Sequence, residues 1–161
     1  MTTRAERSEV GGLLKKSMEV MTVGTGEKDA QNGRDFYRYF FTHYPQVKKY
    51  FRGAENYTAE DVQKSERFTI LGQRMLIAVH IVVEIYENAE VFKAFIRELV
   101  GKHRVLKLDP ALWHTFFVAF VGLIETKTKL DDATKGAWQT LGKDFNDEAQ
   151  GFLKKHGLPH V

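Results

Sequence analysis

The chain has 161 residues, 43% of them hydrophobic and 28% charged, which is the composition of a soluble globular protein with a single domain over residues 1–161. The absence of cysteine excludes disulfides, thiolate catalysis and iron–sulfur clusters, and the mild net charge of +3 comes from lysines scattered along the chain, so we expect no nucleic-acid site. No apolar run is long enough to span a membrane and no signal-like segment opens the chain, so we expect a cytoplasmic protein, unless a signal was removed.

Apolar residues at helical spacing predict two helices in the first third of the chain. The first carries Val10, Leu13, Leu14, Met18 and Met21 and ends at Gly24–Gly26. The second runs from about Glu27 to His43 and stops before Pro45. Gly33 lies inside this second helix, where glycine lowers helix propensity, so we expect another helix to approach closely at that position.

The middle of the chain contains two further predicted helices. Residues Thr58 to Asp61 have the form of a capping box, which predicts a long helix reaching to about Tyr86. Its apolar face consists of Phe68, Leu71, Gly72, Met75, Val79, Val82 and Tyr86. The next helix opens at Asn88 and is stopped by Asp109-Pro110, and its apolar face consists of Phe92, Phe95, Ile96 and Leu99. His103 follows Leu99 by one helical turn.

Two more helices complete the prediction. Pro110 opens a helix whose apolar residues are Leu112, Trp113, Phe116, Phe117, Phe120 and Leu123. Asp131 or Asp132 caps the last helix, which Gly157 and Pro159 close. Since no strand-like alternation occurs, the sequence predicts one all-α domain of six or seven helices. From its own segment alone, His103 has two possible roles. It is either an ordinary core or surface histidine, or a metal ligand at the end of an apolar helix.

Several motifs, in order and at matching spacing, resemble the globin family and in particular the nematode globins. These are the strings DFYRYFFTHYP, KKYF, YTAEDVQ, FKAFIREL and DPALW. Tyr37, Pro45 and Phe51 follow the order of the family pattern, and Leu71 and His103 stand 32 positions apart, as its distal and proximal positions do. The resemblance covers about residues 10–156 and implies a globin fold of six to eight helices enclosing one haem.

The resemblance implies roles for individual residues. His103 would bind the haem iron through Nε2, with its other ring nitrogen donating to the carbonyl of Leu99. Phe51 would stack on the porphyrin, and Met75 and Phe117 would line the pocket with Leu71. The group would be haem b, held without a covalent link because the chain has no cysteine.

The distal side departs from the usual globin pattern. Leu71 occupies the position where globins commonly carry His or Gln, and Gln73 is turned away by about 200° unless a local kink brings it round. Tyr37 is then expected to be the sole distal donor to bound O2. Arg74, three residues after Leu71, is either solvated, paired with a haem propionate or in contact with the ligand.

Three functional hypotheses follow. The first is reversible binding of O2, and of CO and NO, for storage, transport or scavenging by a monomer or homodimer. The second is a haem enzyme, such as a nitric oxide dioxygenase or a peroxidase, which would need fast reduction by a cellular reductase. The third is a helical interaction domain without haem, which would show no Soret band.

Overall fold

The computed structural model describes residues 3–161, and this range contains helices and no strand. In chain order the elements are α1 (Arg4–Ser17), η1 (Met18–Val20), α2 (Glu27–His43), η2 (Pro45–Tyr50), α3 (Ala59–Gln63), α4 (Glu66–Ile85), α5 (Ala89–Lys102), η3 (Arg104–Leu106), α6 (Leu112–Lys127) and α7 (Asp132–Lys155), where η marks a 3-10 helix. The predicted all-α class is confirmed, and the bounds predicted for α2 match those observed.

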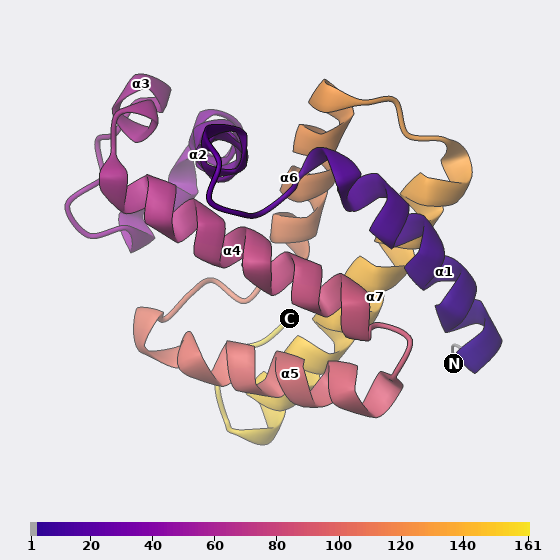
Figure 1. Cartoon of the computed structure of the whole chain (residues 1–161). Helices are drawn as coiled ribbons and strands as arrows, with labels where there is room; N and C mark the ends of the chain where they lie inside the picture. The colour runs from indigo at the N-terminus through magenta and orange to yellow at the C-terminus, as the bar shows by residue number, and fades with distance from the viewer. Residues whose placement is uncertain (1–2) are drawn as a thin grey trace.

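The helices pack in crossed pairs around one core. α4 crosses α2, while α5 packs on α7, and α1 lies against both α7 and α4 (Figure 1). Trp138, Phe36 and Phe120 are fully buried where α2, α6 and α7 meet. The indole of Trp138 donates to the hydroxyl of Ser17 at 2.9 Å, which ties α7 to the end of α1.

The predicted long helix in the middle of the chain is two helices, so that prediction was wrong in part. The capping box at Thr58 and Asp61 exists, but it opens only the five-residue α3, which ends at Gln63 with Lys64 as its C-cap. The Ser65 hydroxyl then accepts a hydrogen bond from the backbone N–H of Phe68 and starts α4. A second N-cap, seven residues after the first, therefore divides the segment.

The helix that carries Leu99 ends earlier than predicted, at Lys102 rather than before Pro110. The chain tightens there, because the N–H of Leu106 bonds to the carbonyl of His103 and that of Lys107 to Arg104, each three residues back. Lys107 then adopts the left-handed conformation (φ 50°, ψ 48°), which ends the turn. His103 is thus the first residue after α5.

α4 is 20 residues long and contains an 18-residue window with a mean hydropathy of 1.6, so by length and composition alone it could cross a membrane. A core helix of a soluble protein passes the same test. One side of α4 is buried in the core through Phe68, Leu76 and Val79. The outer side includes Ile70, which is 55% exposed. The packing of its inner side identifies α4 as a core helix.

The close approach predicted at Gly33 is present, and its partner is Gly72 of α4. A Cβ atom added to Gly33 would lie 2.6 Å from the backbone carbonyl carbon of Gly72, and one added to Gly72 would lie 2.4 Å from that of Gly33. Real Cβ atoms do not approach backbone atoms so closely, so both positions require glycine as long as the two helices keep this separation.

Gly33→Ala is expected to lower the free energy of unfolding by about 1–3 kcal/mol, because the added methyl forces α2 and α4 apart. This loss outweighs the gain of about 1 kcal/mol in helix propensity. Urea denaturation measures the difference. The control is Gly151→Ala in α7, whose Cβ would meet nothing within 4 Å. Equal stabilities of the two variants would contradict the role assigned to the contact.

Candidate functional site

His103 is held in a defined orientation at the end of α5. Its Nδ1 lies 2.8 Å from the carbonyl oxygen of Leu99, one turn back. When Nδ1–H donates this bond, the lone pair lies on Nε2. Within the described range, Nε2 has no hydrogen-bond partner. The side chain is half-buried, so it offers an oriented, unoccupied nitrogen to a ligand.

Trp113 lies beside His103 and was missed as a site residue in the sequence. The two ring centroids are 5.4 Å apart and the rings meet edge to face. Trp113 also packs on Phe145 of α7, at 6.0 Å. The sequence showed Trp113 only as one apolar residue of the helix after Pro110. Its position at the start of that helix, directly after the His103 segment, was the available signal.

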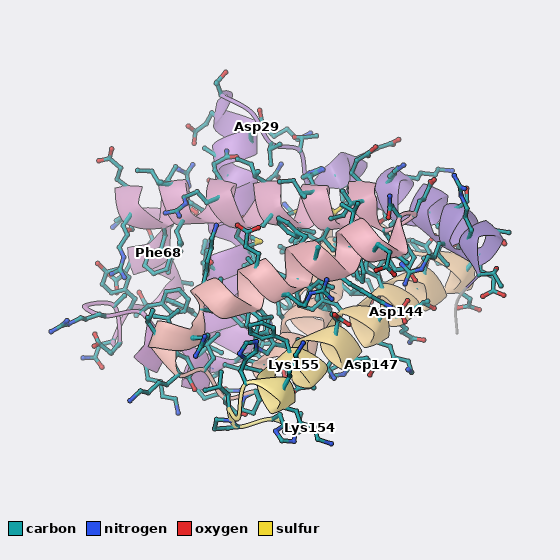
Figure 2. The ribbon with its side chains drawn as sticks, turned by 90° about the horizontal axis from the view of Figure 1, so that it is seen from below. Asp29, Phe68, Asp144, Asp147, Lys154 and Lys155 are labelled. Carbon is teal, nitrogen blue, oxygen red and sulfur yellow. The ribbon has the colours of Figure 1, made fainter. Side chains whose placement is uncertain are left out.

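Tyr37, the second predicted site residue, lies on α2. It is 7% exposed, and its ring packs edge-on against Phe51 at 5.5 Å and Phe68 at 5.3 Å. Phe68 is labelled near the start of α4 in Figure 2. Within residues 3–161 the hydroxyl of Tyr37 makes no hydrogen bond. Residues from α2, α4 and the segment after η2 thus enclose a hydroxyl that has no protein partner.

Burial raises the pKa of the Tyr37 hydroxyl above its usual value, and the positive charge of Arg74 acts in the opposite direction. The first effect is the larger, so the hydroxyl keeps its proton and stays a hydrogen-bond donor at neutral pH. Arg74 itself is exposed.

The raised pKa predicts a stability effect at alkaline pH. Above about pH 10 the unfolded chain loses the Tyr37 proton while the folded chain keeps it, so stability falls by up to about 1.4 kcal/mol per pH unit from this group. Tyr37→Phe should therefore lose less stability between pH 10 and 11 than the wild type in urea denaturation. Tyr44→Phe, at a partly exposed position, is the control. Identical pH slopes for wild type and Tyr37→Phe would refute the effect.

The apolar side chains predicted to line the site come from α4 and α5. α4 and α5 are joined by the turn at residues 86–88 and diverge away from it (Figure 1). Leu71 and Met75 on α4 and Leu99 on α5 are only partly buried, although all three pack on the core. α4 is a continuous helix through this region, so no kink turns Gln73 toward the position of Leu71.

Phe117 of α6 takes a different place from the other predicted pocket residues. Its ring lies 4.9 Å from that of Phe145, and its Cβ faces Gly142, so it packs toward α7. It reaches the His103 side of the molecule through Phe145 and Trp113. Phe117 is therefore a buried member of the wall behind His103.

The chemistry of the site fits a metal carried by a flat apolar group. Within the described range, no three His, Cys, Asp or Glu side chains are grouped to hold a bare metal ion. A single imidazole nitrogen can still bind a metal whose other ligands belong to a prosthetic group. Half-buried apolar side chains would cover the faces of such a group, and Tyr37 would stand opposite His103.

Comparisons with known proteins agree with this geometry. The family model described as Globin matches residues 34–149. A globin-like protein of Caenorhabditis elegans is 51% identical over 155 residues, covering 96% of this chain and 98% of its own. A myoglobin of Nippostrongylus brasiliensis is 50% identical over 134 residues, covering 83% and 87%.

Solved structures show the same relationship. The high-resolution structure of a C. elegans globin-like protein has a TM-score of 0.94 at 50% identity, and it covers 100% of this chain and 99% of its own. A ferric myoglobin of Aplysia limacina has a TM-score of 0.76 at 16% identity, covering 94% and 98%. The second comparison shows that the fold is retained at low sequence identity.

Proposed function

Because this chain belongs to the globin family, it binds haem and O2, and we propose that His103 ligates the iron while Tyr37 donates a hydrogen bond to the bound O2. The observation that carries the proposal is the pair of unoccupied polar atoms, Nε2 of His103 and the buried hydroxyl of Tyr37. Both belong to side chains that are otherwise held in place. The group is haem b bound without a covalent link, since the chain has no cysteine.

The haem iron supplies reversible binding of O2, and of CO and NO, and the protein side chains tune it. The hydrogen bond to the Leu99 carbonyl keeps His103 in the tautomer that presents Nε2 and makes the imidazole a stronger ligand. The edge-to-face contact with Trp113 restricts rotation of the His103 imidazole. Phe51 and Met75 contribute apolar surface that keeps water away from the bound gas, and Phe117 supports the wall behind His103.

The positive charge of Arg74 lowers the pKa of Tyr37, against the larger effect of burial. It forms no ion pair within residues 3–161, so its guanidinium is available to a haem propionate or to the ligand. Both groups carry negative charge, and a charge-assisted hydrogen bond to either is stronger than a neutral one.

Leu71 has no polar atom, so no side chain at its position can hold a water molecule on ferric iron. We expect the ferric wild-type protein to be five-coordinate or only weakly hydrated. Leu71→Gln should convert it to a water-bound six-coordinate spectrum, because an amide can hydrogen-bond the water. Leu71→Met, which adds no strong donor or acceptor, is the control. A clean water-bound spectrum in the wild type would contradict the placement of Leu71.

The proposal is tested first by absorption spectra of the purified protein as isolated, after dithionite, and then under O2 and CO. We expect a Soret band, a five-coordinate ferrous form and binding of both gases. The absence of a Soret band after haem is added would refute the proposal. A six-coordinate ferrous spectrum would show that a side chain occupies the O2 position.

A further inference from the structure

A cavity lies at the end of α5 that is opposite His103, where the start of α1 meets the turn between α4 and α5 (Figure 1). Its volume is about 480 Å³. Arg4 and Arg7, one turn apart on α1, line one side, and residues 87–90 line the other. None of these residues belongs to the candidate haem site. The cavity is therefore a candidate binding site of its own.

Arg7 is held at the wall of this cavity with one donor unused. Its side chain is 6% exposed, and its guanidinium lies over the ring of Tyr86 at 4.5 Å. Nη1 donates to the backbone carbonyl of Tyr86 at 2.7 Å, and Nη2 lies 3.6 Å from Oδ2 of Asp144, which Figure 2 labels on α7. Nε is buried and has no hydrogen-bond partner within residues 3–161. A buried donor without an acceptor is unfavourable, so a ligand that supplies one would be stabilised here.

The first turn of α5 adds backbone donors on the other side of the cavity. α5 begins at Ala89, and the side chain of Asn88 accepts a hydrogen bond from the N–H of Val91. The N–H groups of Ala89 and Glu90 have no acceptor within the described range. Because the first amides of a helix carry partial positive charge, they form a favourable position for an anion.

The two acids of the lining leave the charge of Arg4 in place. Glu87 pairs with Lys15 at 3.5 Å, and its side chain lies against Gly11, two turns beyond Arg4 along α1. Arg4 is exposed and forms no ion pair in the part of the chain that the structure describes. Glu90 is also exposed and unpaired in that part. Its carboxylate therefore opposes the binding of an anion, which gives the site an internal control.

We propose that this cavity binds a small organic phosphate, with its phosphate group between Arg4, Arg7 and the first amides of α5. A phosphate monoester carries about 1.5 to 2 negative charges at neutral pH and three acceptor oxygens, so it can face α1 and α5 at once. A carboxylate offers one charge on two oxygens. Guanidinium groups bind phosphate through paired hydrogen bonds.

The size of the cavity favours an organic phosphate over the bare ion. Small-molecule sites have volumes of about 300–1,000 Å³, and this cavity lies within that range. A phosphate group at the arginines would leave room for an organic remainder. Bound there, the ligand joins the start of α1 to the start of α5, and it stabilises the folded protein by mass action.

The test is a titration of the protein in its CO form with inorganic phosphate, followed by NMR of the backbone amides. Sodium chloride keeps the ionic strength constant. We expect saturable shifts of the amide signals of Ala89 and Glu90. Acetate, which represents the carboxylates, should bind at least about threefold more weakly because it carries less charge. Equally tight binding of acetate would overturn the assignment to phosphate, and wild-type amides at 89 and 90 that do not shift would overturn the site.

Single variants test the charges of the lining in opposite directions. Arg4→Gln should raise the Kd for phosphate at least about fivefold, and Glu90→Gln should lower it at least about twofold, because local charge governs such binding. The matched control is Lys28→Gln, an exposed cation in the first turn of α2, with a change below about 1.5-fold. Arg7 is left intact because its buried contacts support the fold. Circular dichroism melting verifies that the variants fold.

A Kd that rises equally in Arg4→Gln and Lys28→Gln would overturn the proposal, because the binding would then follow net charge alone. So would a Glu90→Gln variant that binds phosphate more weakly than the wild type. The cavity contains no residue of the haem site, so the same titration applies to a chain without haem. Failure of the phosphate site is thus distinguished from failure of the proposed function, which the Soret band tests.

Discussion

Replacing His103 with glycine should remove the protein ligand of the iron, and added imidazole should restore it. The hydrogen bond from Nδ1 to Leu99 orients Nε2 of the half-buried His103. Within residues 3–161, His160 also bonds through Nδ1, to the carbonyl of Leu158 at 3.1 Å, but its side chain is exposed. His80, the other partly buried histidine, has its Nε2 only 2.7 Å from the carbonyl of Met21. We expect haem to dissociate at least roughly 10- to 100-fold faster, since loss of an outer-shell partner alone has an effect of that size.

The first measurement is the rate of haem transfer to an apoprotein acceptor. The second is the ferrous spectrum with and without imidazole at about 10 mM, the concentration that half-saturates a ligand whose binding free energy is about 3 kcal/mol. Imidazole should bring back the five-coordinate ferrous spectrum in His103→Gly. His160→Gly, at an exposed position near the end of the chain, is the control. An unaltered ferrous spectrum in His103→Gly would show that another group binds the iron.

Tyr37→Phe should release O2 about 10- to 100-fold faster while CO dissociation changes little. Bound O2 carries partial negative charge, and a hydrogen bond to such an acceptor contributes roughly 1.5–3 kcal/mol. Each 1.4 kcal/mol or so is a factor of ten in rate. Bound CO is less polar and gains less. Within residues 3–161 the hydroxyl has no hydrogen-bond partner, so donating to the ligand breaks no bond within the protein.

Stopped-flow displacement of O2 by CO, and of CO by NO, measures both rates. Tyr39→Phe is the matched control, because Tyr39 lies on the same helix two residues away and its ring packs on His43. Similar O2 off-rates in wild type and Tyr37→Phe would show that Tyr37 is not the donor. A large increase for CO as well would indicate a general opening of the pocket.

The helices could be predicted where a continuous apolar face and clear capping residues define them. α2 and the cap of α7 at Asp131 are examples. The division between α3 and α4 was missed because the apolar periodicity continues across Lys64 while a single hydroxyl, that of Ser65, determines the start of α4. The early end of α5 was missed because it depends on a tightened turn and on the left-handed backbone of Lys107, which the lysine side chain does not signal.

The sequence predicted the helix on which each candidate site residue lies, because each residue belongs to a recognisable local motif. The orientation of His103 follows from local geometry, since Leu99 is one turn away. The neighbour Trp113 was not predictable, because its position depends on which turns meet in space. The bond between Asp109 and Tyr50, for instance, joins segments 59 residues apart in the sequence.

The contact between Gly33 and Gly72 also sets the dimensions of the space available to a gas molecule. Tyr37 follows Gly33 by one turn on α2, and Leu71 and Met75 flank Gly72 on α4. The two missing methyl groups therefore fix how far the phenol stands from the distal wall. If Tyr37 donates to O2 as proposed, enlarging either glycine would be expected to lengthen that hydrogen bond. Two residues that would not touch O2 would thus influence how long it stays bound.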